Sequence, residues 1–343
     1  MLKVHRLVVI GSCSLALLPL ALYVYHKQKN SGIQVKTNCE TNNGVKKTNF
    51  SNLKDFKKEK LTSDVARSLN MLLTSNDSEI KRDVLVMLQQ ASAFSSNFVV
   101  IRDSDCLDSM LALLDANDSS PIVKRQNLCI LQTTTNLVCD ILNLQVVQRF
   151  LDTIFSIANT MEYSDQACAA LQLLCNAALT PTGCRMLNTY IPALYDMLQT
   201  KDPYMLRQVF SMLVNLSCDP ESRGLLLQSK IPLHLRETLA YCLSSAIQPL
   251  VTIQLVNFLK NVYPQVESVC PSVIGDSSLQ SGPLSLADFL RLQQTQTTLK
   301  LRLQLLLSEP ATNELVVELR RQMEALYIIL DHFHTAPNER PAV

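Results

Sequence analysis

Cysteine is the residue type in this sequence with the widest chemistry, because a thiolate can attack a substrate, bind a metal or form a disulfide. The chain of 343 residues contains 11 cysteines and no Cys-x-x-Cys pair. Most lie in apolar helical patterns, among them Cys129, Cys168, Cys175 and Cys242. Apolar surroundings raise the pKa of a thiol and make cysteine a small core residue. We therefore expect reduced, buried cysteines in a compartment that is not oxidising.

Other residue types that commonly carry catalysis form no recognisable site. The 7 glycines contain no phosphate-binding loop pattern. His332 and His334 are two residues apart, whereas a helical metal site needs the spacing i, i+4. The net charge of +1 gives no general attraction to polyanions. We predict a protein that is not an enzyme, with no cofactor, no metal, no small-molecule substrate and no nucleic-acid partner.

The body of the chain consists of helical segments that repeat. Four similar segments begin near residues 70, 111, 154 and 194, and each has a turn with an aspartate followed by a longer amphipathic helix. We expect these aspartates at or near helix N-caps; they are Asp77, Asp118, Asp165 and Asp202. A period near 40 residues with two or three helices per unit is typical of armadillo and HEAT solenoids. The predicted fold class is an all-α, armadillo/HEAT-like α-solenoid.

The first thirty residues contain an uncharged segment, from Leu7 to Tyr25, between basic residues. Its 19 residues would span about 28 Å as a helix, close to the roughly 30 Å of a bilayer core. Bulky residues follow it where a signal peptidase requires small ones. We therefore predict an N-terminal transmembrane helix that is retained as an anchor. Its anchor positions are Leu7, Ile10, Leu15, Leu18, Leu22 and Tyr25.

A basic stretch follows the anchor. Between His26 and Lys60 there are nine lysines and three acidic residues. The first 60 residues have a net charge of +8, and because the whole chain has +1, the remaining residues have −7. Such a stretch is typical of a disordered linker and would also be attracted to an anionic membrane surface. We divide the chain into an anchor (1–30), a basic linker (31–60), a solenoid of about five to six degenerate repeats (61–335) with a loop at 264–283 and C-terminal capping helices, and a tail (336–343).

Two segments carry a family resemblance. LVNLSCDPESRGLLLQSKIP, from Leu213 to Pro232, is similar to the third helix of an armadillo repeat and the start of the next repeat, and LLCNAALTPTGCRMLNTYIP follows the same pattern. With its anchor and linker, the chain resembles the vertebrate family of X-linked armadillo proteins and their autosomal relatives, armadillo repeat-containing proteins ten and twelve. The resemblance implies a single-pass protein of the mitochondrial outer membrane with a cytosolic C-terminal body. It also implies Miro GTPases and TRAK kinesin adaptors as partners.

One repeat position supports two hypotheses. Ala93, Asn136, Asn176 and Asn215 recur at spacings of 43, 40 and 39 residues. These asparagines either fix the stacking of neighbouring repeats or line a groove that binds peptides. Armadillo families that bind nuclear-import signals use such a ladder to hold the backbone of an extended peptide, together with tryptophans, and this chain has no Trp. The acidic body would favour basic ligands through electrostatic steering.

The predicted function is that of a non-enzymatic, membrane-tethered armadillo scaffold binding proteins that control mitochondrial distribution, transport or fusion and fission. Two alternatives stay open. A cytosolic or nuclear form would be an interaction module that regulates growth or transcription. A protein of the endoplasmic reticulum membrane with a lumenal body would use the Asn-x-Ser sequons at Asn49, Asn76, Asn117 and Asn215 and would need oxidised cysteines.

Overall fold

The computed structural model describes the chain from Phe56 to Thr335, apart from residues 119, 160–163, 245–247, 267–283, 309 and 311–312. The predicted anchor, nearly all of the predicted linker, most of the predicted loop and the predicted tail lie outside the described residues. The chain divides into two units, Met1–Lys47 and Thr48–Val343, and every described residue belongs to the second.

The described residues form helices and no β-strand. The helices of the first half are α2 (Ser63–Leu73), α3 (Ser78–Ser92), η2 (Ser95–Asn97), α4 (Phe98–Asp103), α5 (Cys106–Leu111), α6 (Pro121–Leu137), α7 (Ile141–Gln148), α8 (Leu151–Ala158) and α9 (Asp165–Ala177). Those of the second half are α10 (Pro181–Leu187), η3 (Asn188–Tyr190), α11 (Ile191–Met197), α12 (Pro203–Cys218), α13 (Pro220–Gln228), α14 (Leu235–Cys242), α15 (Pro249–Val262), η4 (Tyr263–Gln265), α17 (Leu286–Arg291), α18 (Gln293–Ser308) and α19 (Glu314–Thr335). The predicted all-α solenoid is confirmed, whereas Pro264 and Gln265, expected to begin the loop, lie in η4.

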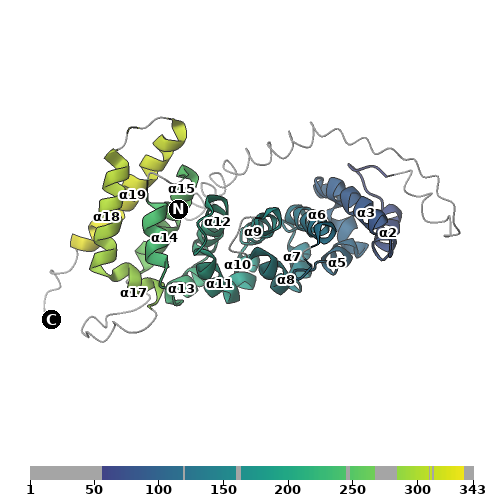
Figure 1. Ribbon diagram of the computed structural model, residues 1–343, viewed down its shortest axis with the longest axis horizontal. Helices are drawn as coiled ribbons and strands as arrows, with labels where there is room; N and C mark the ends of the chain where they lie inside the picture. Colours follow the sequence, from purple (N-terminus) through teal and green to yellow (C-terminus); the bar gives the residue numbers. More distant parts are fainter. Residues whose placement is uncertain are drawn as a thin grey trace. The chain divides into compact units, whose positions relative to one another are not determined.

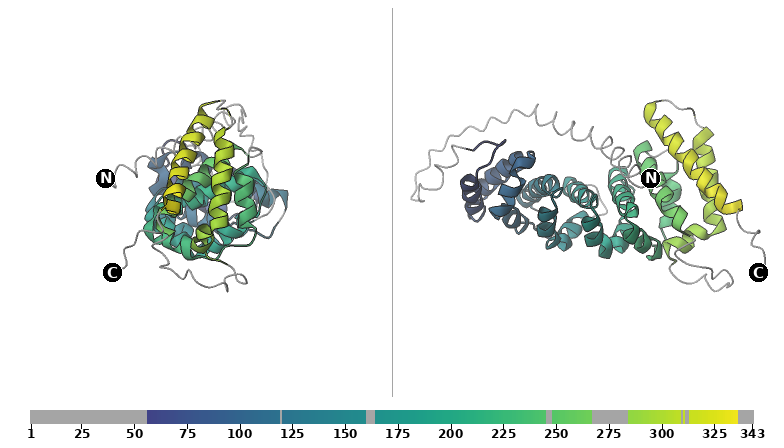
Figure 2. Two further views of the ribbon diagram at one scale, coloured as in Figure 1. Left: turned by 90° about the vertical axis from the view of Figure 1, so that its left-hand side faces the viewer. Right: turned by 180° about the vertical axis from the view of Figure 1, so that it is seen from behind.

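Five long helices, α3, α6, α9, α12 and α15, form one row of the stack, and each packs against the next (Figure 1). We call them the ladder helices. α19 packs against α15 at the end of the row. Shorter helices such as α5, α8 and α11 lie on the opposite side of the stack, as the view from behind also shows (Figure 2). The buried apolar side chains form one cluster that runs from Leu61 to Leu330, so neighbouring repeats supply one another's core.

Two of the predicted aspartates begin ladder helices as N-caps. The Asp77 carboxylate caps α3, and the Asp202 carboxylate accepts a hydrogen bond from the Met205 amide (2.9 Å) at the start of α12. Such bonds satisfy backbone amides that have no partner inside the helix. Pro203 occupies the first position of α12, where its missing N–H leaves no hydrogen bond unmade.

The other two predicted aspartates lie beside the caps. Ser120 caps α6 and Ser164 caps α9, because a serine hydroxyl reaches the free backbone amides as well as a carboxylate does. Asp118 accepts a hydrogen bond from the Ser120 amide (2.7 Å), and Asp165 is the first residue of α9. An acidic residue in the first turn still stabilises the helix through its dipole.

The described residues contain no single helix that is both long and apolar enough to cross a bilayer. Ser78–Ser92 and Ser95–Asp103 meet the requirement together, but they join at a bend of 117°. The first of these segments is α3, which packs against α2 and α6.

The last helix pair, α18 and α19, has a mixed outer surface. Lys300 and Asp331 join the two helices by an ion pair (3.0 Å). Four aliphatic side chains are more than half exposed, namely Leu301 (56%), Leu305 (60%), Val317 (55%) and Ile328 (57%). Capping units of solenoids usually have a polar outer surface. The outer surface of this pair is only partly polar, since it also carries these exposed aliphatic side chains.

Gly183 lies where α10 approaches the end of α9 too closely for a side chain. A Cβ atom at this position would lie 1.8 Å from the carbonyl oxygen of Ala177. The amide of Gly183 also donates the N-terminal capping hydrogen bond of its helix, to the Thr180 hydroxyl (3.0 Å). Because the obstacle is backbone, a larger residue would have to push the two helices apart.

We expect Gly183→Ala to lower the free energy of unfolding by about 2–3 kcal/mol, as overpacking at a close contact does. Gly224→Ala is the matched control, because Gly224 lies in α13 with no atom within 4 Å of the added methyl. The control should be neutral or stabilising by up to about 1 kcal/mol, since alanine favours helix. Urea unfolding of the full-length protein followed by circular dichroism measures both, and equal effects of the two substitutions would contradict the close approach.

Candidate functional site

Each ladder helix presents a stripe of four side chains on one face, spaced three or four residues apart. The stripes are Arg82, Val86, Gln89 and Ala93; Arg125, Cys129, Gln132 and Asn136; Asp165, Cys168, Gln172 and Asn176; Tyr204, Arg207, Ser211 and Asn215; and Leu250, Ile253, Asn257 and Asn261. We call these residues the ladder face. All of them are exposed or half-buried except Arg207 and Asn215, which are each 9% exposed.

The three predicted asparagines occupy equivalent positions on the ladder face, and each joins its helix to the previous ladder helix. The side-chain nitrogens donate from Asn136 to the Ser92 hydroxyl (3.0 Å), from Asn176 to the Thr135 carbonyl (3.2 Å) and from Asn215 to the Cys175 carbonyl (3.0 Å). The two carbonyls lie in the last turns of their helices, where backbone acceptors have no donor within the helix. Asn215 is therefore buried in a structural contact, which leaves no room for a glycan at its sequon.

A fourth asparagine completes the row and was missed by the sequence analysis. Asn261 donates to the Ser217 hydroxyl (2.9 Å), the same kind of contact with the preceding ladder helix. It lies 46 residues after Asn215, beyond the range of 39 to 43 that defined the repeat position. A search for asparagine near the end of each long apolar helix, rather than at a fixed period, would have found it.

The ladder face also carries amide groups without protein partners. The side-chain oxygens of Asn136 and Asn176 accept no hydrogen bond from the described residues. Gln89 donates to the Gln132 side-chain oxygen (2.7 Å), which leaves the Gln132 nitrogen free. Gln172 has no side-chain partner in the described part of the chain. The ladder face therefore offers both hydrogen-bond donors and acceptors.

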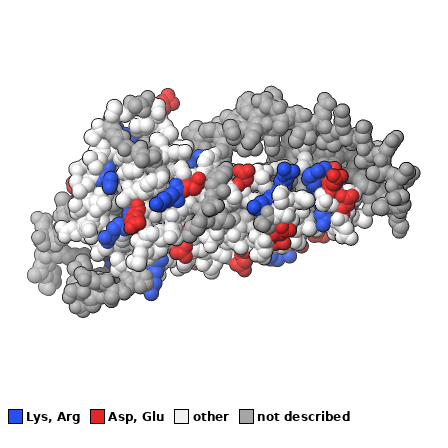
Figure 3. Space-filling view, in the orientation of Figure 1, with Lys and Arg blue, Asp and Glu red and all other residues white. Residues whose placement is uncertain are grey.

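Charged residues are few on the ladder helices, and basic ones predominate. The six basic residues are Lys81, Arg82, Lys124, Arg125, Arg207 and Lys260, and the three acidic residues are Glu79, Asp83 and Asp165. The net negative charge of the body therefore resides on the shorter helices, on α19 and in the turns. On the face shown in Figure 3, basic and acidic side chains lie interspersed. The attraction for basic ligands that the net charge suggested does not extend to the ladder face.

The cysteines of the described residues are free thiols, and two of the four named in the sequence differ from the expectation of burial. Cys175 and Cys242 are buried, whereas Cys129 and Cys168 are only half-buried because they lie on the ladder face. Loss of hydration still raises the pKa of Cys129 to about 11 and that of Cys168 to about 12. Neither thiol is activated as a nucleophile at neutral pH.

Metal-binding side chains do not gather in the described part of the chain. No group of three or more His, Cys, Asp or Glu residues there could hold a metal ion. The ring nitrogen Nδ1 of His332 lies 2.8 Å from the Ile328 carbonyl oxygen. The side chain of His334 lies outside the described residues.

A row of long helices joined by side-chain amides, over one continuous core, defines an α-helical repeat solenoid. The chain belongs to the Armadillo-like family, whose model matches residues 61–271. No curated protein matches the chain.

Several solved structures are similar in fold. A designed armadillo repeat protein superposes with a TM-score of 0.55 at 15% identity, covering 77% of this chain and 99% of its own. Another, in complex with the peptide (KR)4, gives 0.55 at 14% identity, covering 76% and 99%. Computationally designed armadillo repeat proteins for modular peptide recognition give 0.54 at 14% identity, covering 77% and 99%. At these identities the likeness establishes the fold alone.

We expect Asn215→Ala to lower the free energy of unfolding by about 1–2 kcal/mol, because it leaves the buried Cys175 carbonyl without its side-chain donor. Asn136→Ala removes a bond from an exposed side chain to the Ser92 hydroxyl, which still donates to the Gln89 carbonyl (2.8 Å), and should cost less than about 0.5 kcal/mol. Urea unfolding of both variants measures the difference. Equal losses would show that burial does not set the strength of these contacts.

Proposed function

We propose that this protein is a non-enzymatic scaffold whose ladder face binds an extended segment of a partner protein. Residues 1–30 would anchor it in the mitochondrial outer membrane, with the repeat body in the cytosol. The proposed partners are proteins that control mitochondrial distribution, transport or fusion and fission, with Miro GTPases and TRAK kinesin adaptors among them. The resemblance of the anchor, linker and repeats to the X-linked armadillo proteins and their relatives supports the choice of membrane and partners.

The observation that carries the binding proposal is the set of unpartnered amides on the ladder face. An extended peptide presents alternating N–H and C=O groups, and each needs a partner when it leaves water. Side-chain amides such as Gln172 supply both a donor and an acceptor. Packed helices lie about 8–10 Å apart, a distance that about three residues of extended chain span. Successive ladder helices can therefore contact residues of a bound segment that are two or three positions apart.

Selectivity for side chains must come from residues other than tryptophan, because the chain has none. Tyr204, Leu250 and Ile253 place apolar surface on the second half of the ladder face. Arg125 places positive charge on the first half, where Arg82 is paired with Asp83 (3.0 Å). A segment with an acidic part and an apolar part would match this arrangement. Two designed proteins of the same fold recognise peptides or are bound to one, which supports peptide binding by this fold.

We expect the double substitution Gln132→Ala with Gln172→Ala to reduce capture of Miro GTPases and TRAK adaptors by the full-length protein at least tenfold. Loss of two contacts worth about 1 kcal/mol each accounts for this magnitude. Capture from cell extracts by a tagged full-length chain, quantified by immunoblot, measures the change. Gln228→Ala is the control, since Gln228 is exposed on α13 away from the ladder face. Unchanged capture by a double variant of normal thermal stability would contradict the proposal.

The anchor is tested separately by imaging. A fluorescent fusion of the full-length chain should outline mitochondria, and a fusion that lacks residues 1–30 should become diffuse. The physical reason is that the uncharged segment from Leu7 to Tyr25 is the part of the sequence long and apolar enough to hold the chain in a bilayer. A nuclear or reticular pattern of the full-length fusion would contradict the proposed location and favour one of the alternatives.

A further inference from the structure

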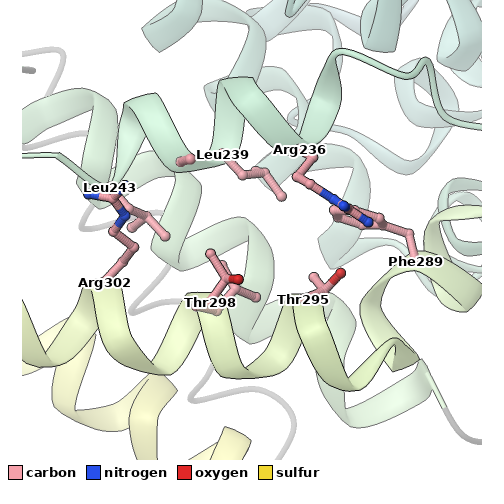
Figure 4. A pocket seen from close by; sticks show the side chains of 9 residues that line it. Arg236, Leu239, Leu243, Phe289, Thr295, Thr298 and Arg302 are labelled. Atoms are coloured by element: carbon pink, nitrogen blue, oxygen red, sulfur yellow. The ribbon is translucent and has the colours of Figure 1, made fainter.

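A narrow crevice lies between α14 and α18, away from the ladder face (Figure 4). Leu239 from α14, Leu243 just after the end of α14 and Phe289 from α17 give it apolar walls. Thr295 and Thr298 point into it from α18 (Figure 4). Its volume is about 20 Å³, enough for one water molecule or a methyl-sized group. The crevice can therefore admit a small side chain and no larger ligand.

Thr295 gives this crevice an unsatisfied hydrogen-bonding group. Its side chain is 6% exposed, and its hydroxyl oxygen has no hydrogen-bond partner among the described residues. Buried hydroxyls elsewhere in the fold are satisfied: Thr252, which is 2% exposed, donates to the Cys242 carbonyl (2.8 Å). Buried polar groups without partners are rare in folded proteins. A polar group that enters the crevice could supply the hydrogen bond that the Thr295 hydroxyl lacks.

The crevice has a positive charge at each end. Arg236 lies beside Phe289 at one end, and Arg302 lies near Leu243 at the other (Figure 4). Arg236 makes one long contact, 3.5 Å to the Gln294 side-chain oxygen, and Arg302 has no partner among the described residues. No acidic residue of the described chain lines the crevice. Both guanidinium groups are therefore available to carboxylates of a partner.

The spacing of the two arginines selects the shape of that partner. Along α14 the crevice extends from Arg236 to Leu243, and along α18 from Thr295 to Arg302, which is seven residues in each case. Seven helical residues rise about 10 Å. On a partner helix, side chains at i and i+7 share one face at this distance. On an extended strand, residues on one face are about 7 or 13 Å apart, so a strand matches less well.

We propose that the crevice binds an acidic helical segment of a partner protein, with two carboxylates seven residues apart and a small residue between them. The carboxylates bond to Arg236 and Arg302. A serine or alanine at i+3 or i+4 enters the crevice, and a serine hydroxyl bonds to Thr295. This site is separate from the peptide-binding ladder face, so either proposal can fail without the other.

The test uses fluorescein-labelled, alanine-based helical peptides and the full-length protein in nanodiscs, with binding followed by fluorescence anisotropy. The probe has two glutamates seven residues apart and a serine four residues after the first. We expect it to bind at least tenfold more tightly than a peptide of the same composition with the glutamates five residues apart. A peptide with lysines in place of both glutamates should not bind. Equal affinity for the two glutamate spacings, or no binding of the probe, overturns the proposal.

Variants of the protein test the same contacts from the other side. Arg236→Ala and Arg302→Ala should each weaken binding of the probe about tenfold, and Thr295→Val should remove the preference for serine over alanine in the peptide. Arg185→Ala is the control, because Arg185 is exposed on α10, far along the chain from the crevice. Melting temperatures within a few degrees of the unsubstituted protein establish that the variants are folded. Full binding by a folded Arg302→Ala variant overturns the proposal.

Discussion

The structure depends on the contact between successive ladder helices, because no repeat can bury its own apolar surface. α12 illustrates the constraint, since 12 of its 16 residues are buried, between α9 on one side and α15 on the other. A helix that is covered nearly all round cannot stay folded outside the stack. What remains accessible of the ladder-face stripe on α12 is Tyr204 and Ser211, since Arg207 and Asn215 are buried. Binding through the ladder face is therefore confined to two to four accessible side chains of this stripe per helix.

That stripe explains why amides recur there. An asparagine side chain is short, so its nitrogen reaches the preceding helix end while its oxygen stays at the surface. The balance between these two roles changes along the stack. Asn136 is exposed and Asn176 half-buried, whereas Asn215 is buried with its nitrogen on the Cys175 carbonyl. The stacking hypothesis thus describes the geometry at α12, and the binding hypothesis has its best support on α6 and α9.

Local features of this fold could be predicted from the sequence, and features that depend on packing could not. The N-caps at Asp77 and Asp202 follow from a few neighbouring residues, so the starts of α3 and α12 were predicted correctly. Periodicity identifies an apolar helix face but not whether a neighbour covers it, which is why Cys129 was expected to be buried. The crevice brings together Arg236 and Arg302, which are distant in sequence and share no repeat position. Only the stacking of α14 on α18 places them at the two ends of one crevice.

The two surfaces differ in how far binding and folding are coupled. On the ladder face the same side chains hold helix ends together, so a substitution there changes stability and affinity at once. At the crevice the charged groups are exposed ends of arginine side chains, and their removal leaves the apolar walls in place. α14 packs against both α15 and α18, so one helix supports the last part of the ladder and one wall of the crevice. The ladder face and the crevice lie on different faces of the stack. An extended segment bound to the ladder face therefore leaves the crevice open, and a scaffold that holds two segments at once requires this separation.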